Sequence, residues 1–469
     1  MKRAKHRSCS IPPLSEMVRD MKAKRRRSLK REARAIFRAG LNAVHAGEAV
    51  YRYMKIEKEK GQEYLVCGKQ KISMDETERI FVLGAGKASS QMARAVERRL
   101  GNRIDGGAVV TQYGYAEKCR RIEILEASHP VPDSSGLEAS RKIEKLTADA
   151  RKEDLVIFLL SGGGSALMPA PAPGISLEDK QSATNSLLRA GAPIEALNCV
   201  RKHLSELKGG NLARKVFPAR MCVLLVSDVI GDPLDVIASG PAIGDSTTFF
   251  EAKAHLERYG VFQEMPKAIK ERIEAGCRNE IPDTPAPGDK IFKRVSHHVV
   301  ANNTIALRAA YEKAKSIGCN VKVQTNSLSG EAKEVGKSIA EDGKMISGSS
   351  RKKRSPQCLL YGGETTVRVV GGGIGGRCQE LALSFAIEIC GHENICLLAA
   401  GTDGRDGPTE AAGAIVDGRT AKTSQNQGLD PNDYLRDNNS HHFLRQRHAC
   451  ICTGPTGTNV MDLVIMLVN

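Results

Sequence analysis

A glycine-rich loop with a single lysine is the first segment whose residue types could do chemistry. It reads LGAGKAS over residues 83–89 and follows a short β-rich stretch at residues 80–83. Gly84 and Gly86 would let the backbone come close to a ligand, and the start of a following helix favours an anion. Lys87 would add a point charge for a phosphate group. One interpretation of the loop is a phosphate-binding turn. The alternative, a solvated surface lysine beside a structural turn, explains the spacing about equally well.

A second glycine loop, SGGGS, follows the fully apolar run at residues 155–160. Three successive glycines cost conformational entropy, so we expect them to have a use. Their backbone N–H groups could form an anion-binding nest, with two serine hydroxyls as further donors. A flexible turn is the less favoured alternative. The candidate substrate-binding residues here are Ser161, Gly162, Gly163, Gly164 and Ser165.

Two carboxylates follow the next apolar strand, at residues 221–227. Asp228 and Asp232 could hold Mg²⁺ or accept a proton, because a Mg²⁺ site often takes one or two carboxylates plus substrate phosphates. Capping of a helix or turn by aspartate is the alternative. Arg201 and Lys202, which lie between the second and third loops, favour an anionic substrate, unless they form a solvated helix face.

Four more glycine loops lie close together near the C-terminal end, more than turns alone require. Their repeated hydroxyls and backbone N–H groups favour a phosphate-rich ligand. Arg377 is the one cation in the richest loop and is a candidate clamp on a transferred phosphoryl group. Asp403 and Asp406 are candidate metal or ribose ligands, against a strong alternative of Asp-Gly turn chemistry. The remaining candidates for cofactor binding are Glu364, Thr365, Thr456, Gly457, Thr458 and Asn459.

Alternating apolar runs and helical stretches place these loops on an α/β fold with a parallel sheet. Ligands bind beyond the carboxyl ends of such strands, where the first three loops lie. We expect a basic disordered tail (residues 1–27), a large Rossmann-like domain (28–340), a basic linker or insertion (341–357) and a smaller α/β domain (358–469).

Composition excludes several classes of protein. The chain has 469 residues and a net charge of +16, of which residues 1–38 carry +11. Aromatic residues are only 4% and Trp is absent, which argues against base-stacking nucleic-acid platforms. No apolar run reaches the roughly 18 residues of a membrane span, and no secretory signal is visible. The expectation is a cytoplasmic protein, with a mitochondrial location as the alternative, and with a homodimer as the commonest form of soluble oligomer.

In this order and spacing, the motifs resemble those of the type II glycerate kinases, two-domain enzymes whose small C-terminal part is the MOFRL domain. The resemblance covers about residues 30–469. The shared motifs are GAGKAS, HPVPD (129–133), SGGGSAL, VRKHLS, LKGG, SDVIGD, IASGP (237–241), GGET, GGR-x-QE, GTDG-x-DGPT and TGPTGTNV.

The resemblance implies ATP- and Mg²⁺-dependent phosphorylation of D-glycerate in a cleft between the two domains. The product would be 2-phosphoglycerate, with 3-phosphoglycerate as the alternative. Lys87 and Arg377 match the lysine and arginine expected to be critical to catalysis. The chain departs from the family at Cys378 and Met461, where asparagine is usual or common. An amide's hydrogen bonds to a ligand would be lost at Cys378.

Two other functions compete with a kinase. The first is reduction of hydroxypyruvate with NAD(P)H, because proteins that resemble this one have carried that label. The GAGKAS loop looks like the dinucleotide-binding fingerprint that such a reductase needs. That match fails in detail: Ser89 replaces the third glycine, and the candidate acid, Asp105, precedes the second strand. The second is a nucleic-acid or scaffold role for the basic residues 1–38, which predicts salt-sensitive RNA binding.

Overall fold

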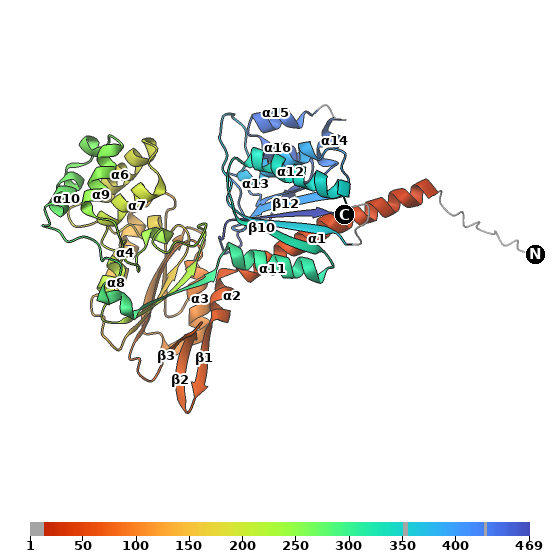
Figure 1. The fold of residues 1–469 in the computed structure, drawn as a ribbon. Coiled ribbons are helices and arrows are strands. Elements are labelled where there is room, and N and C mark those ends of the chain that lie inside the picture. Colours follow the sequence, from red (N-terminus) through yellow and green to blue (C-terminus); the bar gives the residue numbers. More distant parts are fainter. Residues whose placement is uncertain (1–13, 350–354, 426–428) are drawn as a thin grey trace, which may run out of the picture. The chain divides into compact units, whose positions relative to one another are not determined.

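The computed structural model describes residues 14–349, 355–425 and 429–469 (Figure 1). The chain forms two compact units. The larger unit consists of Leu41–Ala306 and Pro455–Met461. The smaller unit consists of the described residues up to Gly40, Leu307–Gly454 and Asp462–Asn469.

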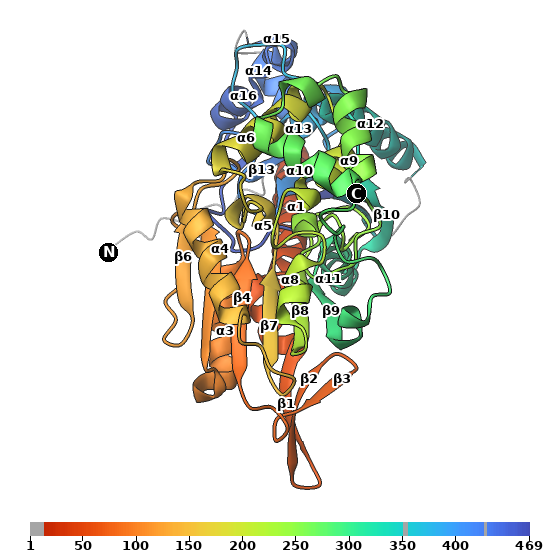
Figure 2. The same cartoon turned by 90° about the vertical axis from the view of Figure 1, so that its left-hand side faces the viewer.

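A six-stranded sheet organises the larger unit, and all of its neighbouring strands are parallel. The strand order is β6-β5-β4-β7-β8-β9, and Figure 2 shows most of these strands side by side. Chain order therefore reverses between β4 and β7, as in doubly wound dinucleotide folds. The strands are β4 (Ile80–Ala85), β5 (Gly106–Gln112), β6 (Glu123–Ala127), β7 (Leu155–Leu160), β8 (Arg220–Val226) and β9 (Val295–Ala301).

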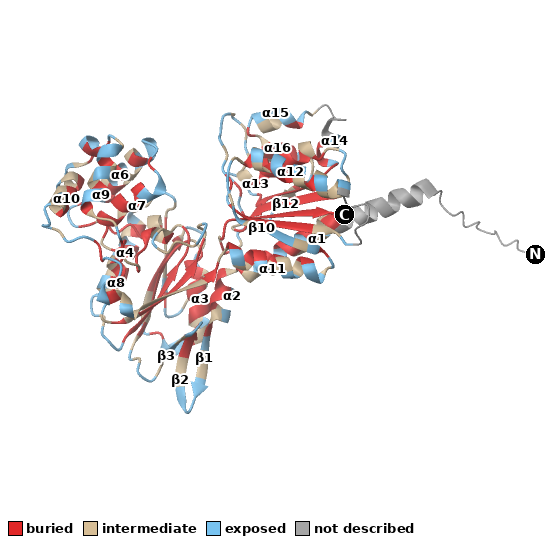
Figure 3. Ribbon diagram, in the orientation of Figure 1, coloured by how far each residue is buried: buried red, intermediate tan, exposed pale blue. Residues whose placement is uncertain are grey.

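The central strands are apolar throughout because both faces of this sheet are covered. Alternate residues of β7 (Val156, Phe158 and Leu160) pack in one core with α4 and α8. The intervening residues point to the other face, as the two-residue period of a strand requires. Figure 3 shows the strands as largely buried. The helices next to the sheet are α2 (Ala46–Tyr53), α3 (Ser89–Leu100), α4 (Ser134–Thr147), α5 (Gly164–Leu167) and α8 (Asn211–Val216).

Two smaller substructures complete the larger unit. Four helices share a separate apolar core, and the side chains of Ser176 and Thr248 begin two of them with capping boxes. These helices are α6 (Leu177–Arg189), α7 (Ile194–His203), α9 (Phe249–Arg258) and α10 (Lys267–Cys277). An antiparallel sheet contains β1 (Met54–Glu59), β2 (Gln62–Cys67) and β3 (Gln70–Ser73).

A mixed six-stranded sheet organises the smaller unit, in the order β10-β11-β15-β12-β13-β14. β10 and β11 are parallel, whereas β15 pairs antiparallel with both β11 and β12. The strands are β10 (Asn320–Leu328), β11 (Gln357–Gly363), β12 (Ile395–Gly401), β13 (Gly413–Asp417), β14 (Cys450–Ile451) and β15 (Asp462–Val468).

Helices cover both faces of the mixed sheet (Figure 1). Residues of α12, α13 and α16 share one core with it, and α1 and α11 lie on its other side. The helices are α1 (Leu14–Ala43), α11 (Asn303–Ser316), α12 (Ala332–Ser349), α13 (Arg377–Glu388), α14 (Thr420–Gln425), α15 (Pro431–Arg436) and α16 (Ser440–Gln446).

The predicted fold class is confirmed, but the predicted domain boundaries differ from the structure. Residues 14–27 of the expected disordered tail belong to α1, and residues 341–349 of the expected linker continue α12. Residues 1–13 and 350–354 lie outside the described residues. The domain boundary expected at residue 340 also differs, because β10 pairs with β11 and so belongs to the smaller unit.

Among the described residues, no helix combines the length and the apolar character that crossing a membrane requires.

Candidate active site

The loops after β4 and β7 meet where the strand order of the parallel sheet reverses. The backbone N–H of Lys87 donates to the carbonyl of Gly162 at 2.9 Å. The N–H of Ala88 donates to Oγ of Ser161 at 3.0 Å. Open α/β sheets bind their ligands at this reversal point. The structure thus brings the GAGKAS and SGGGS loops together at the expected edge of the sheet.

Two glycines of these loops are required by their surroundings. Gly86 has a φ of +140°, and a Cβ built on it would lie 2.1 Å from Oγ of Ser161. Gly163 has a φ of +85°, and its Cβ would lie 2.9 Å from Cδ2 of His129 and 3.3 Å from Cγ of Lys87. The glycine-rich sequence therefore lets the two loops, His129 and Lys87 approach one another.

Asp228 lies against the SGGGS loop (residues 161–165), which is called the glycine nest below. A Cβ on Gly162 would be only 1.8 Å from Oδ2 of Asp228, and Nδ2 of Asn459 donates to that oxygen at 3.1 Å. The loop that carries Asn459 belongs to the larger unit, where Oγ1 of Thr458 donates to the carbonyl of Val44 at 2.6 Å. This places a loop from the C-terminal end of the chain beside Asp228.

Replacement of Gly162 by alanine should disturb this part of the site. We expect kcat to fall by roughly 100-fold, since a displacement of about 1 Å in a catalytic group has that effect. The new methyl group must displace the Asp228 carboxylate, whereas alanine at the uncrowded Gly348 meets no atom within 4 Å. Steady-state kinetics of both variants check this, and an equal kcat for both would show that Asp228 does not need its present position.

A cluster of buried cations lies behind the nest. The ammonium of Lys208 donates to the carbonyls of Ser165 at 2.9 Å and Met168 at 3.0 Å. Burial, together with the nearby charge of Arg201, lowers the pKa of Lys208 to about 7. Burial also lowers the pKa of Lys180 and of Arg201. No described residue accepts a hydrogen bond from the Arg201 side chain or forms an ion pair with it, so this guanidinium is available for an anionic ligand.

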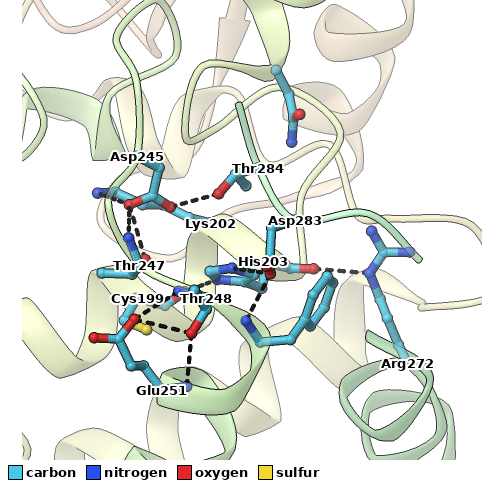
Figure 4. A network of polar contacts seen from close by, with 12 residues as sticks. Cys199, Lys202, His203, Asp245, Thr247, Thr248, Glu251, Arg272, Asp283 and Thr284 are labelled. Atoms are coloured by element: carbon cyan, nitrogen blue, oxygen red, sulfur yellow. Dashed lines mark hydrogen bonds and ion pairs between the residues drawn. The ribbon is translucent and has the colours of Figure 1, made fainter. Parts of the chain in front are cut away.

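Lys202 points to a different partner. Its ammonium lies 3.1 Å from Oδ1 of Asp245, and both side chains are buried. Figure 4 shows the carboxylate of Asp245 between Lys202, Thr247 and Thr284, and both threonine hydroxyls donate to it. The neighbouring residues Arg201 and Lys202 therefore have different surroundings, and the charge of Lys202 is neutralised inside the protein.

Asp232 lies in a left-handed turn with a φ of +54°. Its Oδ2 accepts a hydrogen bond from Nδ2 of Asn302. Within residues 14–349, 355–425 and 429–469, no three His, Cys, Asp or Glu side chains gather closely enough to hold a metal ion.

In the smaller unit, Arg377 is held rigidly at the first turn of α13. Its Nε and Nη2 donate to the two oxygens of Asp462 at 2.6 and 2.9 Å. Its Nη1 lies 2.9 Å from Oε1 of the half-exposed Glu364. Burial works against the charge of Arg377, but hydrogen bonding and attraction from Asp462 outweigh it and raise the pKa. Asp462 thus fixes the guanidinium in place.

Asp406 binds the N-terminal end of the same helix, α13. Its two carboxylate oxygens accept the backbone N–H groups of Cys378 at 3.1 Å and Gln379 at 2.8 Å. Asp406 therefore caps α13 and positions Arg377 through the backbone. The neighbouring Asp403 accepts the N–H of Arg405 at 3.0 Å, which is turn chemistry. Thr365 is buried.

The carboxyl of Asp406 should make stability depend on pH. Burial raises its pKa to about 6 from an ordinary 3.8, so the folded protein binds this proton more tightly than the unfolded chain does. Its contribution to stability is complete below about pH 4 and is lost as pH rises through about 6. We expect the unfolding free energy of wild type minus that of Asp406→Asn to fall across this range. Denaturant titrations at several pH values check this, and a constant difference would contradict it.

Comparisons with known proteins match two family models to the chain. A family model described as a domain of unknown function, DUF4147, matches residues 32–274. A model described as the MOFRL family matches residues 357–462. A D-glycerate 2-kinase from Thermotoga maritima is 46% identical over 399 residues, which cover 85% of this chain and 92% of that protein. A glycerate 2-kinase from Pyrococcus horikoshii is 39% identical and covers 91% of this chain and 94% of its own length.

The chain belongs to the glycerate kinase family. A crystal structure of a glycerate kinase from Thermotoga maritima covers 94% of this chain and 100% of its own, at 42% identity and a TM-score of 0.83. The resemblance inferred from the sequence motifs is therefore confirmed. The chain is also similar to a protein from Agrobacterium vitis named a putative hydroxypyruvate reductase, which is 39% identical over 83% of this chain and 87% of its own length.

The structure clarifies where this member departs from the glycerate kinase pattern. The side chain of Cys378 is buried in the core of the smaller unit. Burial raises the pKa of its thiol, and the adjacent Asp462 contributes. The residue thus packs in the protein interior, and its backbone N–H is taken by Asp406. Met461 is also buried and has a φ of +67°.

Sequence reasoning missed two residues of this glycerate kinase fold that lie beside the candidates. They are His129, in the HPVPD motif, and Asp462, near the end of the last glycine loop. The motif itself was a signal for His129. For Asp462, the only local signal was an acid at the start of an apolar strand, which does not reveal a partner 85 positions away.

Proposed function

We propose that the protein transfers the γ-phosphoryl group of ATP to the 2-hydroxyl of D-glycerate and releases 2-phosphoglycerate and ADP. The observation that carries the proposal is the glycine nest at the reversal point of the parallel sheet, with the unpaired ammonium of Lys87 beside it. No described residue pairs with that ammonium. The relatives named D-glycerate 2-kinase and glycerate 2-kinase support the choice of the 2-hydroxyl.

Phosphoryl transfer asks a protein mainly for positioning and charge stabilisation. Lys87 would neutralise charge on the transferred group, and Arg377, held by Asp462, would do the same from the smaller unit. Mg²⁺ bound with ATP supplies charge neutralisation on the phosphate oxygens, and Asp228 is the residue that would hold it. That the two units enclose the substrates in a cleft stays a prediction, as do the roles of Gly84, Glu364, Thr365, Asp403 and Thr456.

Glycerate would bind through its carboxylate and hydroxyls. Arg201 has an available guanidinium whose planar fork suits a carboxylate. The nest offers the backbone N–H groups of Gly162 and Gly163 and the hydroxyls of Ser161 and Ser165. Lys208 supports this surface, because it holds the carbonyl of Ser165. Lys202 would support it only indirectly, through its pairing with Asp245.

Replacement of Arg201 by alanine should weaken glycerate binding. We expect the KM for D-glycerate to rise roughly 10- to 100-fold, since hydrogen bonds to a charged group contribute about 1.5–3 kcal/mol. The KM for ATP should stay within about twofold. Replacement of the exposed Lys118 by alanine is the control. An unchanged KM for glycerate in Arg201→Ala would remove this residue from the substrate site.

The proposed activity is tested with purified protein, ATP, Mg²⁺ and D-glycerate, with ADP release followed by a coupled assay. L-glycerate and hydroxypyruvate serve as parallel substrates. Glycerate-dependent ADP release with a ³¹P signal of 2-phosphoglycerate would support the proposal. A 3-phosphoglycerate signal would correct the hydroxyl, and a folded protein without ADP release would contradict the kinase.

Reduction of hydroxypyruvate is the second candidate, because relatives carry that name as putative. The structure offers it less support. β5 ends at Gln112, where a dinucleotide fold needs an acid for the ribose. Asp105 precedes that strand, and its carboxylate accepts the N–H of Ile80 at 2.8 Å. NADH or NADPH oxidation with hydroxypyruvate, absent ATP, would be the result that favours the reductase.

A further inference from the structure

His129 lies at the proposed phosphoryl-transfer site but has no assigned role. It follows β6, in the loop that leads to α4, so it belongs to the same edge of the sheet as the two glycine loops. A Cβ on Gly163 would lie 2.9 Å from its Cδ2 and 3.1 Å from its Nε2, and 3.3 Å from Cγ of Lys87. The imidazole and the lysine therefore border the nest at the same glycine.

The imidazole is available for chemistry. Neither ring nitrogen of His129 forms a hydrogen bond or ion pair with any described residue. Burial lowers the pKa of His129 to about 4, and the positive charge of Lys87 contributes. The ring is therefore neutral near neutral pH, and a neutral imidazole has one nitrogen lone pair that can accept a proton.

The charged groups around the ring of His129 keep the imidazole neutral. Lys87 is the neighbouring charge on the adjoining glycine loop. Asp133, on the same loop as His129, accepts hydrogen bonds from the hydroxyl of Tyr113 at 2.7 Å and from the N–H of Gly136 at 3.0 Å. The carboxylate of Asp133 is therefore hydrogen-bonded to Tyr113 and to the first turn of α4, and not to the imidazole of His129.

The aspartate carboxylates that are candidate bases already accept hydrogen bonds from other side chains. Asp228 accepts a hydrogen bond from Asn459, and Asp232 accepts one from Asn302. Asp228 is also the residue that would hold Mg²⁺, which would make it a poorer proton acceptor. Among the groups that border the glycine nest, this leaves the imidazole as the base without a prior partner.

We propose that His129 accepts the proton of the glycerate hydroxyl as that oxygen bonds to the γ-phosphorus. The O–H bond breaks and its electron pair forms the new O–P bond. The bond from phosphorus to the β,γ-bridging oxygen breaks, and its electrons leave with ADP. The proton passes to the imidazole and then to water. This inference rests on the proposed kinase activity and adds a catalytic residue to it.

Binding of ATP should make the imidazole a better base. In the free protein, the charge of Lys87 disfavours imidazolium. Triphosphate oxygens bound at Lys87 would offset that charge, and nearby negative charge favours the protonated ring. A weak base suffices for this chemistry, because kinases that use an aspartate as proton acceptor also rely on a group of low pKa.

Two substitutions separate proton acceptance from hydrogen bonding. Gln in His129→Gln keeps a donor and an acceptor but cannot take up a proton, whereas His129→Ala loses both functions. We expect both variants to lose kcat by about 10²- to 10⁴-fold, with the KM for glycerate within threefold of wild type. Added imidazole should restore part of the activity of His129→Ala, and the fall in wild-type kcat at acid pH should disappear in both variants. His442→Gln, at an exposed histidine, is the control.

The possible results separate this inference from the function on which it rests. A wild type without glycerate-dependent ADP release would overturn the kinase proposal, and the proton acceptor with it. An active wild type whose His129→Gln variant keeps its kcat would overturn the proton acceptor alone, as would an acid limb that persists in both variants. Thermal melting of each variant confirms that a lost rate is not a lost fold.

Discussion

The Arg377→Ala variant is expected to lose kcat by about 10³- to 10⁵-fold, the range measured for arginines that stabilise a transferred phosphoryl group. The substitution should lower kcat more than it raises KM, because the negative charge that Arg377 would stabilise develops on the phosphoryl group in the transition state. Asp462 holds the guanidinium by two hydrogen bonds, at 2.6 and 2.9 Å. The arginine is therefore oriented before any substrate binds.

The same geometry predicts a loss of stability in Arg377→Ala. Its removal leaves the buried carboxylate of Asp462 without this partner, at a cost of about 1–3 kcal/mol. The double variant Arg377→Ala/Asp462→Asn should regain most of that stability and none of the activity. Kinetics and denaturant titrations of both variants separate the two effects. Recovery of kcat in the double variant would show that the arginine acts on the fold and not on the reaction.

The Lys87→Met variant is expected to lose kcat by about 10²- to 10³-fold, as when one preorganised donor to a developing charge is removed. Stability should change little, because no described residue pairs with this ammonium. The lysine lowers the pKa of His129, so its removal should raise the pKa of that imidazole. The ring signals of His129, titrated by NMR, provide a measure of this effect that does not depend on turnover.

Lys118→Met is the matched control, because Lys118 is exposed. Its kcat and the titration of His129 should equal those of wild type. A Lys87→Met variant with the kcat of wild type would remove Lys87 from the mechanism. An unchanged titration of His129 in that variant would show instead that the lysine and the imidazole do not interact as the structure indicates.

The local parts of the site could be predicted because short-range patterns determine them. An apolar run followed by glycines marks a strand that ends in a tight loop, and β7 begins and ends where that pattern predicts. Parallel strands carry their following loops at one edge, so the proximity of Lys87 to the SGGGS loop followed from the fold class. The order of the motifs was enough to identify the glycerate kinase family.

Other assignments depended on partners far away in the sequence. Lys202 looked like a substrate ligand beside Arg201, but it is buried against Asp245, which lies 43 positions away. Asp406 looked like a metal or ribose ligand, and its carboxylate caps α13 instead. Asn459 was expected in the C-terminal domain, and its loop belongs to the larger unit beside Asp228.

The amino-acid sequence by itself determined the α/β class, the family, and the residue types present at each loop of the site. Tertiary structure alone decided which charges remain available to a ligand. A charge is available only if the fold has not already paired it, and pairing follows from burial and from distances between segments remote in sequence. Arg201 and Lys202 are adjacent in the chain. Of these two, Lys202 is paired with Asp245, and the guanidinium of Arg201 has no protein partner among the described residues.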